Sequence, residues 1–310
     1  MLNIYKTIDN KLVECDKIEK DAWINLANPT EEELQFVKKT LLIDDDFLRA
    51  ALDKEEISRV EMDDDTGYAL ITLDVPIFIQ DKNIKTFSTI PVGIIETQDN
   101  IVTVCLQKNQ IIDDFVNEKI KNVFTNLRTR FIFQLLYHIA TRFLLYLRRI
   151  DKCRIVIEKQ LQKTMQNQGL IQLQDLDKSL VFFSTSLRAN MMVLEKIQRG
   201  RILKLYDDDA ELLEDVLIEV EQAIEMSNIY SNILSGTMGA FSSIISNNMN
   251  TIMKILTSIT ILLAIPTMIS GFYGMNVSNL PMPTFGFSML VSVFITAVIA
   301  FILYKKNMLS

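Results

Sequence analysis

Residues 251–304 read TIMKILTSITILLAIPTMISGFYGMNVSNLPMPTFGFSMLVSVFITAVIAFILY. Apart from Lys254, this stretch contains no Asp, Glu, Lys, Arg or His. It holds two mainly apolar runs, residues 251–270 and residues 285–304, and each has the length of about 20 residues that a helix needs to cross a bilayer. The stretch therefore predicts two C-terminal transmembrane helices joined by a short uncharged outer loop, residues 271–284.

Lysines flank the two apolar runs. Lys254 lies one turn inside the first run, and Lys305 and Lys306 directly follow the second. Because positively charged residues favour the cytoplasmic side, we expect both chain ends to be cytoplasmic, with residues 305–310 as a basic tail. Residues 1–20 lack the long apolar run of a secretory signal, which agrees with this orientation. The predicted location is the cell membrane, crossed twice.

The rest of the chain is charged and acidic overall, because 39 Asp and Glu against 32 Lys and Arg give a formal net charge of −7. With no dense basic tract, a nucleic-acid partner is not expected. A single histidine, His138, excludes a zinc site of several His ligands within one chain, and three scattered cysteines argue against a disulfide framework. The sequence has no GxxxxGK[ST] motif and no catalytic triad. We therefore expect neither an enzyme nor an ATP-driven pump, and no resident cofactor.

Residues 1–115 mix helix and strand signals and predict a cytoplasmic α/β domain. Thr30 and Glu33 form a capping box before apolar residues at helical spacing. Short β-branched and apolar runs predict strands at residues 68–79, 89–97 and 100–106. Asp99 and Asn100 predict a hairpin turn between the last two runs.

Residues 116–250 contain no proline and predict a helical stalk. Within it, QNQGLIQLQ at residues 166–174 predicts a break between helices. A long helix is expected over about residues 208–270, continuing from the stalk into the first apolar run. The proline-free part, residues 210–265, would alone span roughly 84 Å as a helix. A helix of that length needs neighbours to pack against, in the same chain or in copies of it.

The first apolar run is followed by Gly271-Phe272-Tyr273-Gly274-Met275-Asn276. The string Tyr-Gly-Met-Asn at the outer end of the penultimate span, with a final span after a short loop, resembles the signature of the CorA family of divalent cation transporters. The resemblance covers the whole chain, from the α/β domain to the basic tail. It implies a funnel-shaped homopentamer whose first spans line a central pore. The implied activity is influx of Mg²⁺, or of Co²⁺ or Ni²⁺, driven by the membrane potential.

Gly274, Met275 and Asn276 are the expected ion-selectivity residues. Mg²⁺ holds its water shell tightly, so a ring of neutral amide oxygens from Asn276 can bind that shell without trapping the ion by charge. Gly274 allows backbones to approach closely, and Met275 is expected to pack. The structural alternative is that Asn276 caps the helix in the left-handed conformation, and the two roles are compatible.

One face of the first span carries the residues that the resemblance places along the pore. They recur at intervals of three or four residues, which is the period of one helix face. They are Gly271, Thr267, Ala264, Thr260, Leu256, Met253 and Asn250. Leu256 and Met253 are expected to form a hydrophobic gate, and Asn250 a second amide ring at the inner mouth. Ordinary packing between helices is the alternative for this face.

The outer loop departs from the family pattern. Many relatives carry an acidic loop after the motif, whereas residues 277–284 read VSNLPMPT and contain no carboxylate. Collection of cations at the outer mouth is therefore expected to be weaker, or to depend on Asn276 and Asn279 alone.

A second departure concerns the regulatory metal site between subunits that the resemblance implies. Asp215 matches the partner on the long helix, but Ala50 and Ala51 stand where an acidic pair is expected. Asp46 and Asp53 flank them. We hypothesise that Mg²⁺ sensing is weakened, or is rebuilt from Asp46, Asp53 and Asp215, with the ion bridging adjacent subunits in a closed state.

Two other functions stay open. One is transport of another divalent ion such as Zn²⁺, as in the ZntB branch, although that branch usually varies the middle of the tripeptide and Met275 is intact. The other is a membrane-anchored metal sensor that does not transport. The polar face of the first span argues against the sensor.

Overall fold

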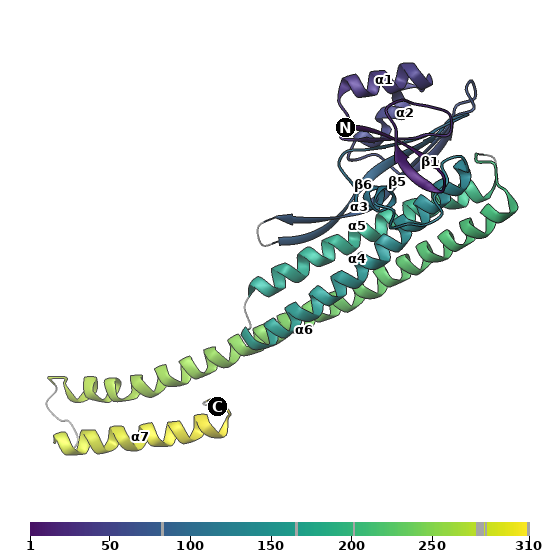
Figure 1. Ribbon diagram of the computed structural model, residues 1–310. Helices are drawn as coiled ribbons and strands as arrows, with labels where there is room; N and C mark the ends of the chain where they lie inside the picture. The colour runs from purple at the N-terminus through teal and green to yellow at the C-terminus, as the bar shows by residue number, and fades with distance from the viewer. Residues whose placement is uncertain (82–83, 165–166, 201, 277–281, 283, 309–310) are drawn as a thin grey trace. The chain divides into compact units, whose positions relative to one another are not determined.

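The computed structural model describes residues 1–310 except 82–83, 165–166, 201, 277–281, 283 and 309–310 (Figure 1). The chain forms two compact units, Met1–Gly236 and Thr237–Ser310. The long helix α6, Asp207–Tyr273, contributes residues to both of them. The first unit holds the sheet that the sequence predicts, and the second holds the two apolar runs.

One mixed sheet forms the centre of the first unit. Its strands are β1 (Leu2–Ile8), β2 (Lys11–Glu14), β3 (Trp23–Ala27), β4 (Arg59–Met62), β5 (Ala69–Asp81), β6 (Ile84–Glu96) and β7 (Ile101–Cys105). They lie in the order β2-β1-β3-β7-β6-β5-β4. Strands β3 and β7 pair in parallel, and the other neighbours are antiparallel.

The predicted hairpin at Asp99 and Asn100 is confirmed as the β6–β7 turn. Glu96 pairs with Ile101 on either side of it. The Thr97 N–H donates to the Asn100 carbonyl oxygen at 2.9 Å and closes the turn. The strand order beyond this hairpin depends on β1 to β4, which sequence patterning did not identify.

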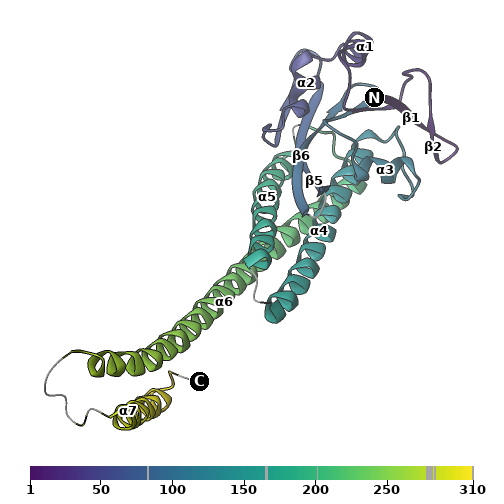
Figure 2. The same ribbon diagram turned by 90° about the vertical axis from the view of Figure 1, so that its left-hand side faces the viewer.

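Helices cover both faces of the sheet. They are α1 (Glu31–Leu41), α2 (Asp45–Arg49), the short 3₁₀ helix η1 (Ala50–Leu52), α3 (Gln110–Val116), α4 (Arg128–Thr164) and α5 (Asn167–Gln198). Helix α2 and η1 pack on β6, and η1 also packs on β7. Helices α4 and α5 lie side by side along β5 and β6 (Figure 2). The predicted capping box of α1 is confirmed, because the Thr30 hydroxyl accepts from the Glu33 N–H and the Glu33 carboxylate accepts from the Thr30 N–H.

Strand β3 shows why the sheet has two cores. All five of its residues are buried, as expected for a strand covered on both faces. Ile24 packs with the residues of α1, α2 and η1. Trp23, on the other face, packs on Phe131 of α4 with ring centroids 5.0 Å apart. The Trp23 indole N–H donates to Thr103 Oγ1 at 3.0 Å, so the polar atom of this fully buried ring is satisfied.

Helix α4 begins at Arg128 rather than near residue 116, where the sequence predicted helical structure to start. Glu118 and Asn122 have positive φ angles of 54° and 58°, which a helix does not allow. The absence of proline alone was therefore not enough to predict helix in this segment.

The break predicted at residues 166–174 is only partly correct. Helix α4 ends at Thr164 and α5 begins at Asn167, so Gly169 lies inside a helix. Residue 166, within the predicted break, lies outside the described residues. A Cβ at Gly169 would lie 2.6 Å from the Leu161 side chain. This glycine allows α4 and α5 to approach closely after the turn, and that role explains it better than helix breaking.

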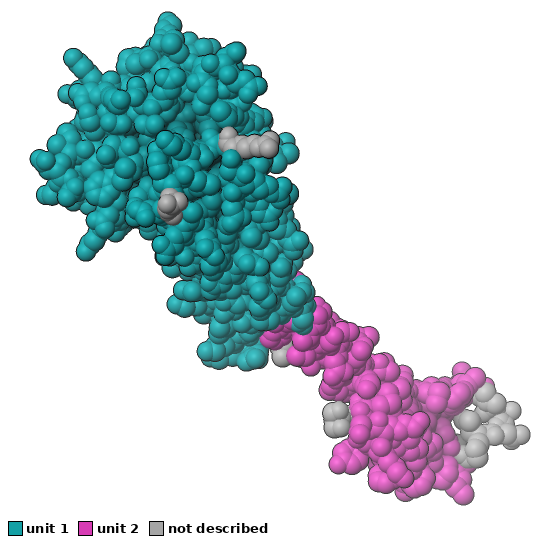
Figure 3. Space-filling model, turned by 90° about the vertical axis from the view of Figure 1, so that its right-hand side faces the viewer, with its two compact units in different colours: residues 1–236 teal, residues 237–310 magenta. Residues whose placement is uncertain are grey.

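The second unit contains the C-terminal part of α6, from Thr237 onward, and helix α7, Phe285–Lys305 (Figure 3). Both helices are long and apolar enough to cross a membrane. In their most apolar windows, only 17% of α6 and 6% of α7 is buried within the chain. An apolar surface this exposed requires lipid or further protein to cover it. The fold is therefore an α/β domain, long helices and two C-terminal apolar helices, as the sequence predicted.

Candidate ion pathway

Helix α6 has a covered face and an exposed face within the second unit. Ser258, Ile265 and Ile269 are buried, with 0%, 6% and 8% of their surfaces exposed. All seven predicted pore-lining residues, Asn250, Met253, Leu256, Thr260, Ala264, Thr267 and Gly271, are exposed. At about 100° per residue, the two sets centre on opposite sides of the helix. The residues predicted to line a pore thus point away from the face that the chain itself covers.

The threonines of the exposed face present oxygen atoms outward. Thr260 Oγ1 donates to the Leu256 carbonyl oxygen at 2.8 Å, and Thr267 Oγ1 donates to the Leu263 carbonyl oxygen at 3.1 Å. Because each hydroxyl proton is engaged with the helix, the oxygen lone pairs remain free to accept. Such oxygens suit a hydrated cation, whose water molecules donate hydrogen bonds.

Ser258 has a role that the sequence did not reveal. By sequence it is one of several small polar residues in the first apolar run. In the structure, its Oγ lies 2.8 Å from the Lys254 carbonyl oxygen and 3.0 Å from the Met308 carbonyl oxygen. The contact with the C-terminal tail therefore explains why a polar residue lies at position 258. Its position on the helix, opposite Thr260 and Thr267, was the available signal.

The Gly274-Met275-Asn276 motif lies directly after the last turn of α6. The Gly274 N–H donates to the Ser270 carbonyl oxygen at 2.9 Å, and a Cβ at Gly274 would lie 3.2 Å from that oxygen. Gly274 thus lies close to the backbone of the turn that ends α6, and the expected approach between backbones at the motif stays a prediction. Met275 is 54% exposed, so the described residues of the chain leave much of it uncovered.

Asn276 is exposed and does not adopt a positive φ. The alternative that it caps α6 in the left-handed conformation is therefore wrong. Its amide remains available to a ligand. The next residues of the outer loop, including Asn279, lie outside the described residues. The expectation that Asn279 helps to collect cations therefore stays a prediction.

The three predicted regulatory carboxylates lie on different elements of the first unit. Asp46 is on α2, Asp53 follows η1 and Asp215 is on α6, and all three are exposed. Within the described part of the chain, no three His, Cys, Asp or Glu side chains are grouped to hold a metal ion. A site built from these carboxylates would need more than one copy of the chain.

Ala50 and Ala51 explain why the expected acidic pair is missing. They are 7% and 0% exposed. The Ala51 Cβ would lie 3.2 Å from a Cβ at Gly93 of β6, so η1 packs closely on the sheet. Carboxylates at these two positions would lie in the core, and burying an unpaired charge there would be costly.

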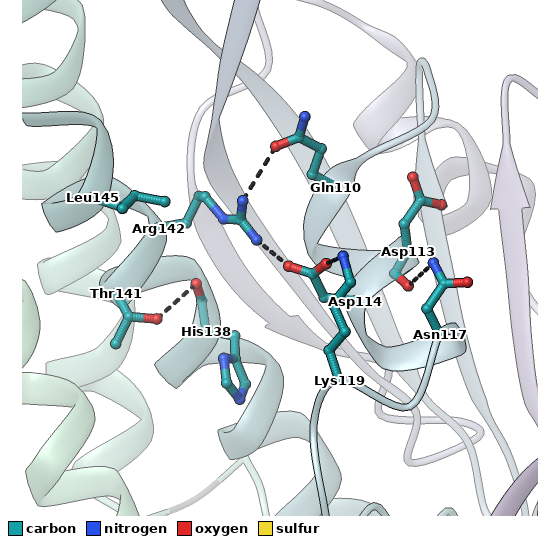
Figure 4. Close-up of a pocket in the computed structure, with 9 residues that line it drawn as sticks. All are labelled: Gln110, Asp113, Asp114, Asn117, Lys119, His138, Thr141, Arg142 and Leu145. Atoms are coloured by element: carbon teal, nitrogen blue, oxygen red, sulfur yellow. Dashed lines mark hydrogen bonds and ion pairs between the residues drawn. The ribbon is translucent and has the colours of Figure 1, made fainter. Parts of the chain in front are cut away.

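A hollow of about 660 Å³ lies between α3 and α4 in the first unit (Figure 4). Asp114 there forms ion pairs with Arg142 of α4 and with Lys119, the latter at 2.7 Å. Arg142 also donates to the Gln110 side-chain oxygen at 3.2 Å. The charges of this hollow neutralise one another, so it serves to attach α3 to α4.

His138, the only histidine, lies in the same hollow. It is half-buried, and its ring packs edge-on against Phe115 at 5.3 Å. Burial lowers the pKa of His138, and the nearby positive charge of Arg142 lowers it further, while Asp114 opposes the shift. His138 therefore packs at the edge of the aromatic core that includes Phe115 and Phe131.

Comparisons with known proteins match the chain almost throughout. The family model of the CorA-like Mg²⁺ transporter protein matches residues 19–306. The cobalt/magnesium transport protein CorA of Methanocaldococcus jannaschii is 30% identical over 292 residues, covering 90% of this chain and 88% of that protein. The complete structure of the CorA magnesium transporter from the same organism has a TM-score of 0.79 at 28% identity, covering 98% of this chain and 96% of that one.

The ZntB cytoplasmic domain from Vibrio parahaemolyticus shares the fold alone, with a TM-score of 0.61, 11% identity, and coverage of 80% of this chain and 97% of that one. The family match, in contrast, spans strands β3 to β7, the long helices and both apolar helices. It is a family of transport proteins and not of enzymes, as the sequence predicted. The chain belongs to the family of CorA-like Mg²⁺ transporter proteins.

Proposed function

We propose that copies of this chain assemble in the cell membrane as a homopentamer that conducts Mg²⁺ into the cytoplasm, with Co²⁺ and Ni²⁺ as further substrates. The exposed face of α6 lines a central pore in this proposal, and α7 lies outside it. Both chain ends are cytoplasmic. No nucleic acid and no resident cofactor take part. Two relatives named as cobalt/magnesium transport proteins support the choice of ions.

The observation that carries the proposal is the division of α6 into opposite faces. One face is covered by the chain, and the other exposes Asn250, Thr260 and Thr267 along an otherwise apolar helix. Polar side chains facing lipid are unfavourable, whereas copies placed around an axis would turn them toward water. The exposed face ends at Asn276, whose amide has no competing role as a left-handed cap.

The ion is proposed to pass with most of its water shell. Mg²⁺ dehydrates reluctantly, so amide oxygens of Asn276 from several copies would accept hydrogen bonds from bound water. Leu256 and Met253 would form a hydrophobic constriction that closes by excluding water, and Asn250 would form the inner amide ring. A divalent ion gains about 4.6 kcal/mol per 100 mV of inside-negative potential. That energy drives influx without nucleotide hydrolysis.

Regulation is proposed to use Mg²⁺ as well. Asp46, Asp53 and Asp215 are exposed carboxylates that could meet between copies, where a bound cation would hold a closed arrangement. Loss of the ion would leave like charges to repel. If Asp215→Ala leaves the Mg²⁺ dependence of transport unchanged, these residues are not the sensor.

The test is Mg²⁺ uptake into liposomes that contain the purified full chain, with an imposed inside-negative potential. Uptake should be present in the wild type and collapse in Asn276→Ala. Asn126→Ala is a matched control, since it changes an exposed Asn of the first unit, outside the proposed pore. No uptake of Mg²⁺ by an intact wild-type oligomer would overturn the proposal. Uptake of Zn²⁺ instead would favour a ZntB-like transporter, and no uptake of any divalent ion would favour a sensor.

A further inference from the structure

The charged side chains of the second unit are all positive. Residues 237–310 contain Lys254, Lys305 and Lys306, and no Asp, Glu, Arg or His. These lysines therefore have no acidic side chain within their own unit. An acidic side chain that pairs with them has to come from outside this unit.

The C-terminal tail after α7 turns back and contacts α6. After α7, Asn307 adopts a left-handed conformation with φ of 51°. The Asn307 N–H donates to the Tyr304 carbonyl oxygen and the Met308 N–H to the Leu303 carbonyl oxygen, both at 3.0 Å. These are the two bonds of a Schellman motif, which turns the chain sharply at a helix end. Met308 is thereby directed back toward α6.

Ser258 completes the contact. Its Oγ lies 3.0 Å from the Met308 carbonyl oxygen and 2.8 Å from the carbonyl oxygen of Lys254. Ser258 has a single hydroxyl proton to donate, and both carbonyl oxygens lie within hydrogen-bonding distance of it. This buried side chain therefore holds the tail that follows Lys305 and Lys306 close to the backbone of Lys254. Lysines separated by some fifty residues of sequence lie at the same end of the α6–α7 pair. We call these three residues, Lys254, Lys305 and Lys306, the lysine cluster.

The surroundings of the lysine cluster are those of a membrane–water boundary. All three lysines are exposed. Ile252, Ile302 and Tyr304 beside them expose 59%, 47% and 66% of their surfaces. Long lysine stems can lie along such apolar surface while the ammonium groups reach the polar layer. The C-terminus of α7 adds a favourable site for positive charge, which helps to hold Lys305 in place.

We propose that the lysine cluster binds the phosphate-bearing headgroup of an anionic phospholipid, and that the Ser258–Met308 contact assembles the site. The proposal rests on the proposed membrane location of α6 and α7, and it does not require that the chain conducts ions. Attraction to an anionic membrane surface is worth about fivefold in binding for each nearby lysine. A headgroup held by lysines of both helices links lipid composition to the position of α6.

The experiment uses the full chain in phosphatidylcholine vesicles with spin-labelled phosphatidylglycerol or spin-labelled phosphatidylcholine as probes. The fraction of immobilised probe measures the preference for each lipid. The wild type should prefer phosphatidylglycerol by about fivefold or more. The triple variant K254Q/K305Q/K306Q should lose this preference, and K254R/K305R/K306R should keep it. The control K11Q/K54Q/K121Q, which removes exposed lysines of the first unit, should also keep it.

Two further arms separate the parts of the proposal. Ser258→Ala should reduce the preference and Ser258→Thr should preserve it, because threonine retains the hydroxyl. Inorganic phosphate at millimolar concentration should not displace the lipid, and displacement would show that the site takes a soluble anion. A wild type that inserts, as shown by flotation, but has no lipid preference overturns the site. A chain that fails to insert overturns the membrane location itself, and the site with it.

Discussion

Ser258 and Thr260 are two positions apart on α6 and point to opposite sides of the helix. Ser258 is fully buried and contacts the Met308 carbonyl oxygen at 3.0 Å, whereas Thr260 is exposed. Both are small hydroxyl residues in an apolar run, yet one joins the chain to its own tail and the other is free to face a pore. Changes on the two faces should therefore affect different properties of the protein.

Leu256→Ser tests the proposed hydrophobic gate. A hydroxyl in the constriction should favour water and raise basal Mg²⁺ uptake by about fivefold, the effect of roughly 1 kcal/mol on a barrier. The measurement is uptake into liposomes at equal protein content. Leu290→Ser is the control, because Leu290 lies on α7 and is 68% exposed compared with 56% for Leu256. Equal increases in both variants would mean a general leak and would rule out a gate at Leu256.

Gly274→Ala tests the close approach at the motif. The new Cβ would meet the Ser270 carbonyl oxygen at 3.2 Å, and relieving this contact would displace Asn276. We expect a cost of about 1 kcal/mol and a loss of uptake of about fivefold. Gly286→Ala, where no atom beyond the neighbouring backbone of α7 itself lies within 4 Å of the added Cβ, should leave uptake unchanged. Normal uptake in Gly274→Ala would show that the motif does not require this approach.

Asp74→Asn tests a buried polar network between the sheet and α5. Ser186 of α5 donates to the Asp74 carboxylate, and the Asn190 side-chain N–H donates to the Asp74 carbonyl oxygen at 2.8 Å. Burial raises the pKa of Asp74 above its usual 3.8, and the bond from Ser186 only partly offsets this. The folded chain therefore holds its proton more tightly than the unfolded chain does.

A raised carboxyl pKa makes stability fall as pH increases from about 3.8 through the folded-state pKa. Asp74→Asn should remove this loss and raise the free energy of unfolding at pH 7 by on the order of 1 kcal/mol. Urea unfolding can be followed by the fluorescence of Trp23, the only tryptophan and fully buried. Asp64→Asn, at an exposed loop position, is the control. An identical pH profile in wild type and Asp74→Asn would contradict this account.

His138 should titrate below pH 6.5, because burial and Arg142 both disfavour its charged form. Since it is the only histidine, selective isotope labelling gives a single NMR titration curve without assignment. The lowered pKa also means that its contribution to stability is complete above about pH 6.5, the unfolded-state value, and is lost as pH falls from there through the lower folded-state pKa. His138→Gln should lose this acid-side slope. A midpoint at or above 6.5 would show that the ring is solvated and not part of the core.

Some features could be predicted from local sequence because local physics determines them. The two apolar runs and the Thr30 capping box depend on residues close together in the chain, and so does the β6–β7 turn at Asp99 and Asn100. The exposed face of α6 was also predictable, since helical period places Thr260 and Thr267 on one side whatever surrounds them.

The start of α4 was not predictable from composition, because positive φ angles at Glu118 and Asn122 interrupt a segment without proline or glycine. Gly169 was misinterpreted for a related reason. Gly169 is needed because the Leu161 side chain of α4 lies where a Cβ at residue 169 would be. A contact between two helices cannot be predicted from the local sequence pattern.

The sequence by itself determined the apolar spans, the motif ending in Asn276 and the polar face of α6, since each follows from residue type and period. Only the tertiary structure decided that Ala50 and Ala51 are buried against β6, that Asn276 is not a left-handed cap, and that Ser258 contacts Met308. Burial and backbone conformation depend on which distant segments meet. These contacts between distant segments are determined by the packing of the whole chain and not by any single stretch of sequence.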